Sequence, residues 1–264
     1  MKNPTLPLFL ALLAPALAAG VCAAPAFAEP PLEQRGMSSG GFRQHDRNRP
    51  QPKAVEPGAE VSVPAPADAV VLLGKDDAEN AKQWKNAAWT QKDGVMTARK
   101  GWQVSAQSFG DCQLHLEFRV PETLKDRKDQ DQGNSGVFFM GDRYEAQVVS
   151  SHPDCNKTYA DGMAGAIYGQ NPPLVNPSRK IGGWNAYDIV FRRPRFNEKG
   201  ECVQKAVMTV FLNGVLVQDH FELMGPTSYM QRAPYAKHAD KLPLQLQDHG
   251  SPDEFRNIWV RELE

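Results

Sequence analysis

Five short segments of the sequence alternate apolar side chains with polar ones that can transfer protons or bind hydroxyl groups. A period of two is typical of β-strands, which place alternate residues on opposite faces of a sheet. If these strands lie in one sheet, its outer face carries carboxylates, amides, a histidine, arginines and an indole. Such a combination of side chains is suited to binding a sugar. The segments are 114–120, 144–148, 187–192, 244–249 and 258–261.

Each segment contributes a small set of residues to this polar face. Glu145 and Gln147 are the strongest candidates for a functional role, because neither strand propensity nor turn chemistry explains them in the middle of a strand. Structural alternatives stay open for other candidates: exposed ion pairs for Glu117 with Arg119 and Asp188 with Arg192, a strand end for His249, a tight turn at Asn134, and the core for Trp184. The five sets are His115, Glu117 and Arg119; Glu145 and Gln147; Asp188 and Arg192; Gln245, Gln247 and His249; Trp259 and Arg261.

The rest of the chain predicts the elements that position these residues. Short runs of alternating polarity recur between 70 and 263, separated by glycine, proline, asparagine and aspartate. They predict an all-β fold, an antiparallel β-sandwich or jelly roll with little helix. Asn213-Gly214 predicts a two-residue hairpin, and 76–84 predicts one or two helical turns capped near Asp76 or Asp77. The chain lacks the long parallel-sheet pattern of a doubly wound fold.

The first 28 residues have the composition of a secretory signal peptide. An apolar run follows Met1-Lys2, and Ala26-Phe27-Ala28 supplies the small residues that a signal peptidase reads. We therefore expect cleavage after residue 28 and a periplasmic or secreted protein, with no stable membrane insertion afterwards. The alternatives are a retained anchor, although Pro15 interrupts the run, and a lipoprotein modified at Cys22, although Val21 stands where a small residue is wanted.

Residues 29–69 are rich in proline, glycine, arginine and glutamine and show almost no apolar periodicity. Such a segment buries too little surface to offset the entropy lost on ordering, so it predicts a disordered linker. Residues 70–264 are expected to form one β-rich domain, which is long enough for an ample core.

Charge and cysteine content narrow the function classes. The net charge of −1 and the dispersed basic residues give no electrostatic footprint for nucleic acid. Cys112 falls on an apolar strand face and is predicted to be a buried thiol. A disulfide between Cys155 and Cys202 stays open. No cysteine and histidine spacing typical of structural zinc occurs.

Eight motifs follow one another along the chain: Ser108-Phe109-Gly110-Asp111 with 114–119, Gly133-Asn134-Ser135-Gly136 with 137–139, 144–148, 164–169, 184–190, 211–214, 246–250 and 255–259. In this order they resemble the signatures of the bacterial 3-keto-disaccharide hydrolase domain family. The resemblance covers about residues 70–264 and implies a concanavalin-A-like or laminin-G-like jelly roll. It also implies an exported bacterial enzyme acting on glycosides whose sugar carries a ketone at carbon 3.

A ketone at carbon 3 acidifies the hydrogen on carbon 2, so a base can remove it and expel the aglycone from carbon 1 before water adds. We hypothesise that Glu145 or His249 is the base. A positive side chain then supports the enolate and a second acid completes the proton relay. The candidates for these two roles are Arg119 or Arg192, and Glu117 or Asp188; Gln147, Asn134 and Gln247 would orient hydroxyl groups, and Trp184 or Trp259 would stack on the sugar.

Two chemical alternatives stay open. A divalent metal bound by the carboxylates and His249 could stabilise the enolate. Direct hydrolysis could instead use Glu117 and Glu145, and the separation of the carboxyl groups would then decide the stereochemical outcome.

The expected partner is a carbohydrate substrate, and two rival functions remain. A non-catalytic carbohydrate-binding module can share the same fold, because fold does not define function. Such a module would keep its affinity without Glu145 and His249 and would depend chiefly on Trp184 or Trp259. A domain that recognises proteins would instead expose an apolar patch.

Overall fold

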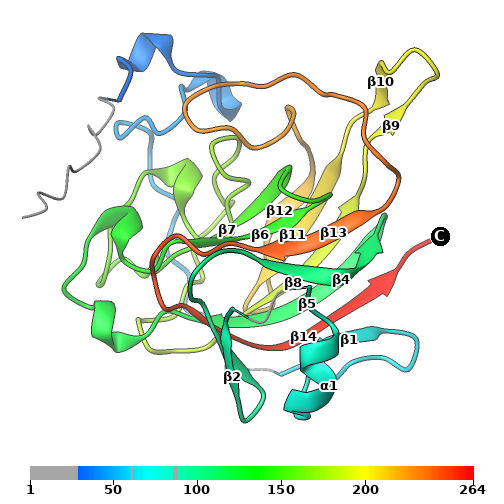
Figure 1. Cartoon of the computed structure of the whole chain (residues 1–264). Helices are drawn as coiled ribbons and strands as arrows, with labels where there is room; N and C mark the ends of the chain where they lie inside the picture. The colour runs from blue at the N-terminus through cyan, green and yellow to red at the C-terminus, as the bar shows by residue number, and fades with distance from the viewer. Residues whose placement is uncertain (1–28, 61, 86–87) are drawn as a thin grey trace, which may run out of the picture.

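The computed structural model describes residues 29–60, 62–85 and 88–264. The predicted signal peptide, residues 1–28, lies outside these residues. Strands dominate the described chain, and none of its helices is long and apolar enough to cross a membrane. Figure 1 shows the strands stacked in layers, with the chain ending just beyond strand β14.

The larger of the two main sheets has eight antiparallel strands. Its order is β12-β11-β8-β5-β14-β3-β2, and β1 pairs with β14. The central strands β5, β8 and β14 carry three of the five predicted polar sets. The strand bounds are β1 (Val70–Leu73), β2 (Thr90–Lys92), β3 (Val95–Thr97), β5 (Cys112–Arg119), β8 (Asn185–Arg192), β11 (Val207–Leu212), β12 (Val215–Glu222) and β14 (Glu254–Glu262).

The smaller main sheet has four antiparallel strands in the order β4-β13-β6-β7. They are β4 (Gln103–Phe109), β6 (Ser135–Phe139), β7 (Tyr144–Val148) and β13 (Leu242–Leu246). A separate ribbon is formed by β9 (Arg195–Phe196) and β10 (Cys202–Gln204). The described helices are α1 (Asp77–Lys82) and the 3-10 turns η1 (Leu32–Gln34), η2 (Ser39–Gly41), η3 (Glu122–Leu124), η4 (Asp129–Asp131) and η5 (Ala160–Gly162).

The two main sheets pack against each other through their apolar faces. Phe139 of β6 stacks on Phe191 of β8 with ring centroids 4.6 Å apart, and Tyr144 of β7 contacts the same ring. The Tyr187 hydroxyl of β8 donates to the Gln147 carbonyl of β7 over 2.5 Å. Each such buried aromatic side chain contributes roughly 1.5–3 kcal/mol to folding. This packing confirms the predicted antiparallel β-sandwich.

Two local predictions are also confirmed. The hairpin between β11 and β12 turns at Asn213 and Gly214, which have φ angles of 54° and 78°. Helix α1 starts where expected, because the Asp76 carboxylate accepts hydrogen bonds from the backbone amides of Ala78 and Glu79. Such a cap satisfies amides that have no partner inside the helix.

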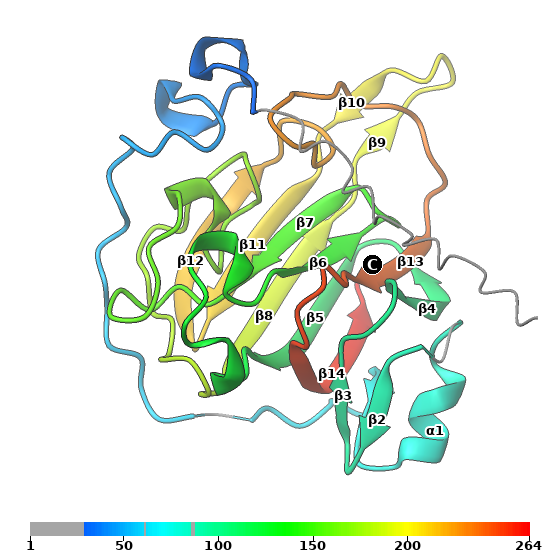
Figure 2. The ribbon, with the colours of Figure 1, turned by 60° about the vertical axis from the view of Figure 1, so that its left-hand side comes forward.

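Residues 29–69 differ from the predicted disordered linker. The described part of this segment, here called the N-terminal arm, runs along the surface of the sandwich (Figure 2). It is fixed by polar contacts: Ala54 forms a β-bridge with Asn176, and Arg179 donates to the Gly58 carbonyl over 2.7 Å. The prediction failed because apolar periodicity does not report hydrogen bonds to a distant surface.

The cysteines and the surface complete the comparison with the sequence. Cys112 is buried as predicted, and Cys155 and Cys202 are both free thiols, so they are not bridged.

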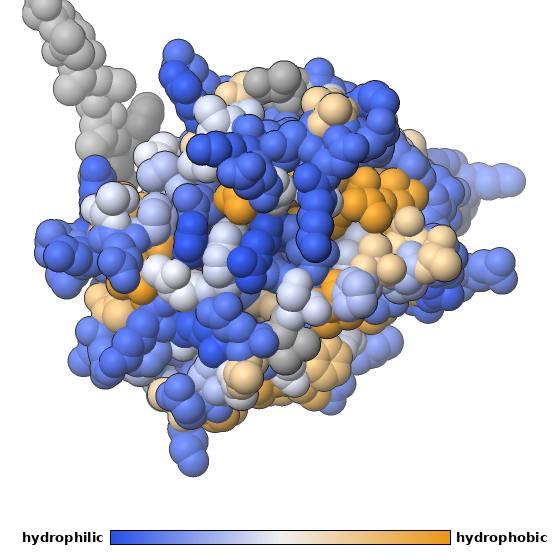
Figure 3. All heavy atoms as spheres, turned by 90° about the horizontal axis from the view of Figure 1, so that it is seen from below, coloured by the Kyte–Doolittle hydropathy of each residue, from blue (hydrophilic) through white to orange (hydrophobic). Residues whose placement is uncertain are grey.

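Hydrophilic side chains cover most of the face seen from below, and apolar ones lie there in separate areas (Figure 3).

Candidate active site

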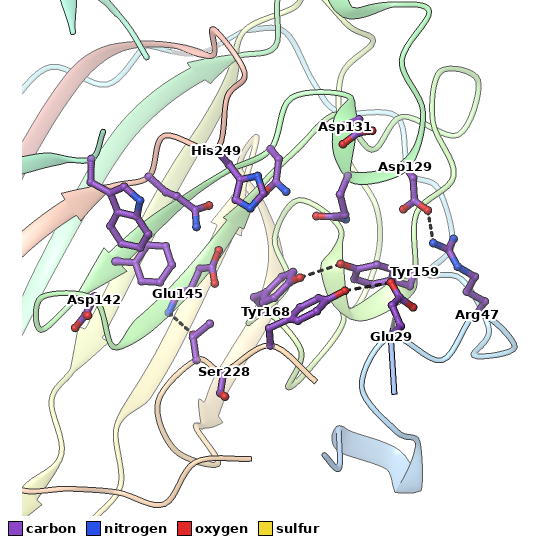
Figure 4. Close-up of a pocket in the computed structure, with 17 residues that line it drawn as sticks. Glu29, Arg47, Asp129, Asp131, Asp142, Glu145, Tyr159, Tyr168, Ser228 and His249 are labelled. Carbon is purple, nitrogen blue, oxygen red and sulfur yellow. Dashed lines mark hydrogen bonds and ion pairs between the residues drawn. The ribbon is translucent and has the colours of Figure 1, made fainter. Parts of the chain in front are cut away.

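A pocket of about 720 Å³ lies on the outer face of the smaller sheet. Its volume is in the range of small-molecule sites. Strands β6 and β7 form its floor, and loops close its sides (Figure 4). It is lined by Glu29, Arg47, Trp102, Asp129, Gln130, Asp131, Asn134, Phe138, Asp142, Glu145, Tyr159, Tyr168, Thr227, Ser228, Tyr229, Gln247 and His249.

Glu145 lies at the bottom of this pocket and is the second residue of β7. Its side chain is only 3% exposed, and burial raises its pKa well above the ordinary value. Gly136 on the neighbouring strand leaves room for the carboxyl group, since a Cβ there would come within 2.5 Å of Glu145 Oε1. The environment therefore favours the neutral, protonated carboxyl, which can act as an acid.

Gln147 orients this carboxyl group from the next outward position of β7. With its amide turned so that the nitrogen faces these oxygens, Gln147 donates to Ser135 O over 2.8 Å and to Glu145 Oε1 over 3.0 Å. In the other orientation, the same nitrogen donates to Gln130 Oε1 over 2.7 Å. Gln147 is fully buried and does not line the pocket. The structure therefore makes it a residue that positions Glu145 rather than one that touches a ligand.

Three other predicted residues reach the same pocket. Asn134 precedes β6, and Gln247 and His249 follow β13. Figure 4 shows the Glu145 carboxyl pointing towards the side of the pocket that holds His249. An exposed imidazole above a buried acid gives two groups that can exchange protons with one bound molecule.

Aromatic side chains line both sides of the Glu145 position. Trp102 packs on Phe138 with ring centroids 4.6 Å apart. The hydroxyls of Tyr159 and Tyr168 are hydrogen-bonded over 2.9 Å. Flat apolar rings beside polar groups suit sugar rings, which carry both C–H faces and hydroxyl groups.

The divalent metal, which the sequence left open as an alternative, has no clear set of ligands among the described residues. In the described residues, no group of three or more histidine, cysteine, aspartate or glutamate side chains is arranged to hold a metal ion. The metal alternative therefore gains no support from the side-chain arrangement around Glu145 and His249.

The prediction of one shared polar surface is wrong. Strands β5, β8 and β14 belong to the larger sheet, whereas β7 and β13 belong to the smaller one. Because the two sheets bury their apolar faces against each other, their polar faces point to opposite sides of the sandwich. Glu117 and Asp188 therefore lie on the far face from Glu145 and cannot share a substrate with it.

On that far face, Glu117 is the centre of a closed polar cluster. It accepts hydrogen bonds from Arg256 Nε and Ser62 Oγ, both over 2.5 Å, and from Asn257 Nδ2 over 2.9 Å. Burial alone would raise its pKa, but the hydrogen bonds from these residues and from His115 lower the pKa to about 2. Glu117 is therefore an ionised, fully partnered carboxylate and not a general acid.

His115 joins the remaining carboxylates of this cluster. Its Nδ1 lies 2.7 Å from Asp188 Oδ1, and its Nε2 lies 3.6 Å from Glu117 Oε1. Burial opposes the charged imidazole, but the two carboxylates outweigh it and raise the pKa of His115. Asp188 thus pairs with His115, and its predicted pairing with Arg192 is not found.

The other predicted sugar contacts are also occupied by the protein. Trp259 is 1% exposed and stacks on His115. Trp184 is covered by the guanidinium groups of Arg119 and Arg256, 4.6 and 4.1 Å from its ring. Arg119 pairs with Glu254, and Arg192 pairs with Asp111.

The sequence reasoning missed several residues of the pocket. Tyr168 falls in the motif 164–169, which the sequence analysis used for the family resemblance without giving this tyrosine a role. Asp129 and Asp131 belong to a polar loop without periodicity, and Glu29 and Arg47 fall in the segment that was predicted to be disordered.

Comparisons with solved structures agree with this fold. A candidate glycosyl hydrolase from Parabacteroides distasonis is 37% identical to this chain, with a TM-score of 0.70 over 85% of this chain and 98% of its own. A second one from the same organism is 23% identical, with a TM-score of 0.53 over 74% of this chain and 99% of its own. The latter similarity supports the fold alone.

Comparisons of sequence identify the domain. No match was found among curated proteins. The family model of the 3-keto-alpha-glucoside-1,2-lyase-like domain matches residues 68–261, which include β7, β13 and the loops around the pocket but not the N-terminal arm. The chain therefore belongs to the 3-keto-alpha-glucoside-1,2-lyase-like domain family.

Proposed function

We propose that the protein is an exported enzyme that cleaves 3-keto-glycosides in the pocket above Glu145. The observation that carries this proposal is a buried carboxyl group at the bottom of a sugar-sized pocket, with its pKa raised by burial. Family membership and the similarity to candidate glycosyl hydrolases support a reaction at a glycosidic bond. The apolar run and small residues of 1–28 support export.

The geometry suits elimination followed by hydration. His249 takes the proton from carbon 2, and the electron pair of that C–H bond forms the double bond to carbon 1. The bond from carbon 1 to the glycosidic oxygen then breaks, and Glu145 donates its proton to that oxygen. Water adds to the resulting unsaturated ketone, placing hydroxyl on carbon 1 and hydrogen on carbon 2. The amides of Asn134 and Gln247 are positioned to donate to the sugar oxygens.

Direct hydrolysis by Glu117 and Glu145 does not fit this arrangement. That route needs two carboxyl groups that flank one glycosidic bond. The two residues lie on opposite faces of the sandwich, and Glu117 is held by Arg256 and Ser62.

A carbohydrate-binding module is the second candidate, favoured by the Trp102–Phe138 pair in the pocket. The two functions are separated by incubating the full-length protein with a 3-keto-disaccharide and with the unoxidised parent, and by measuring sugar release and binding for both. Release from the keto form alone supports the proposal. Binding without release from either sugar would indicate the module.

A further inference from the structure

The N-terminal arm connects the candidate active site with the polar cluster on the far face. Figures 1 and 2 show it starting above the smaller sheet and passing around the sandwich towards β14. The family model begins at residue 68, so the arm lies outside the residues that define the family.

At the pocket, the arm contributes two charged side chains. Glu29 accepts a hydrogen bond from the Tyr229 hydroxyl over 3.1 Å and from Arg35 over 2.9 Å. Arg47 forms an ion pair with Asp129. Figure 4 places Glu29, Arg47 and Asp129 at one end of the pocket, with two tyrosines between them and Glu145.

Behind these side chains, the arm is locked into the fold by His45. Its ring packs against those of Tyr159 and Tyr168, with centroids 4.1 and 5.0 Å away. Its backbone amide donates to both oxygens of the buried Asp161 over 3.1 Å. His45 thus fixes the segment that presents Arg47 and contacts the two tyrosines of the pocket wall.

On the far face, the other end of the arm is held by Glu117, which the sequence predicted to be catalytic, by Trp259, which it predicted to contact the sugar, and by Asn257. Ser62 donates to Glu117, and the Val63 carbonyl accepts from Trp259 Nε1 and Asn257 Nδ2, both over 3.0 Å. The polar cluster of the larger sheet therefore serves as the anchor of the arm.

The arm end of the pocket has the chemistry to bind a hydroxylated group. Arg47 only donates hydrogen bonds, whereas the carboxylates of Glu29 and Asp129 only accept them. Donors and acceptors placed side by side match neighbouring hydroxyl groups, because each hydroxyl group can both donate and accept a hydrogen bond. The Arg47 side chain is 61% exposed, so it remains accessible to a ligand.

We propose that the arm supplies the subsite for the group on the far side of the cleaved bond, and that this group is an uncharged, hydroxylated ring. The keto sugar then lies at the Trp102 end and its aglycone at the arm end, with Glu145 between them. The assignment of the two ends rests on the proposed function.

The test compares a 3-keto-disaccharide with a methyl 3-keto-glycoside, which lacks the second ring. Full-length Arg47→Gln and Glu29→Gln should each raise KM for the disaccharide about three- to tenfold with little change in kcat, because each removes charged hydrogen bonds made before and during the reaction. KM for the methyl glycoside should stay within twofold. Lys53→Gln and Glu33→Gln are matched controls, since both residues are exposed parts of the arm outside the pocket.

Unchanged KM values for the disaccharide would overturn this inference, and so would equal increases for both substrates, which would indicate a general structural effect. If the wild-type protein releases no sugar, the proposed function fails first. The arm is then tested by titrating the same disaccharide and following tryptophan fluorescence. Weaker binding by Arg47→Gln than by Lys53→Gln supports the subsite, and equal or absent binding overturns it.

Discussion

Replacement of Glu145 by glutamine tests the proton donor at the bottom of the pocket. Glutamine has nearly the same shape and can still hydrogen-bond to Gln147, but its amide has no acidic proton to transfer to the glycosidic oxygen. General acid catalysis contributes about 10²- to 10⁴-fold to a rate, which corresponds to roughly 3–5.5 kcal/mol of barrier at 1.36 kcal/mol per decade. We expect kcat for a 3-keto-disaccharide to fall by that factor.

The leaving group separates acid catalysis from a general loss of structure. A 3-keto-glycoside of an acidic phenol needs little protonation on departure, so Glu145→Gln should reduce its kcat much less than that of the disaccharide. The assay is initial-rate release of each aglycone at saturating substrate. Glu198→Gln serves as the matched control, because Glu198 is exposed and lies outside the pocket.

The activity on the disaccharide should depend on pH through the Glu145 carboxyl group, and the direction of that dependence can be predicted. Burial raises the pKa of Glu145, so the protonated acid persists to higher pH than for an exposed glutamate, and activity on the disaccharide should fall as pH rises through that raised pKa. The phenolic substrate should lack this alkaline decrease. The acid role would be refuted if Glu145→Gln lowered kcat equally for both substrates, or if its kcat for the disaccharide stayed within tenfold of wild type.

Three further changes test the surroundings of the site. Gly136→Ala places a Cβ 2.5 Å from Glu145 Oε1, so we expect lower kcat and about 1–3 kcal/mol less stability in urea unfolding. Glu117→Leu leaves Arg256 without its partner and should cost about 3–5 kcal/mol, while any surviving folded protein keeps kcat for the methyl 3-keto-glycoside. Burial raises the pKa of Asp253 to about 8, so its folded form holds a proton that the unfolded chain has lost. The free energy of unfolding should therefore decrease between about pH 4 and 8, by up to 1.36 kcal/mol per pH unit, and Asp253→Asn should remove this decrease as measured by urea unfolding.

Local patterns in the sequence were sufficient to predict the strands, because alternation depends on the nearest neighbours of each residue. Leu114 and Leu116 lie in the core, and His115 and Glu117 lie on the opposite face of the strand, as the pattern indicates, although both are buried there beside the N-terminal arm. The turn at Asn213-Gly214 was equally local.

Local patterns could not predict which of these polar residues lie together in one site. Alternation gives the face of each strand but not the sheet to which the strand belongs. Glu117 and Glu145 therefore looked alike in the sequence, although 27 residues and a change of sheet separate them. The Glu117 cluster also depends on Ser62 and Arg256, which are distant in sequence and carry no periodic signal.

The most direct test of the proposed chemistry is the reaction of the full-length protein with a 3-keto-disaccharide in deuterated water, with mass analysis of the released keto sugar. Elimination and hydration predict release from the keto form, with one deuterium bound at carbon 2. The analysis compares carbon 2 with a substrate control incubated without protein, because the ketone itself exchanges slowly. Release without enzyme-dependent deuterium, or equal release from the unoxidised disaccharide, would contradict this mechanism.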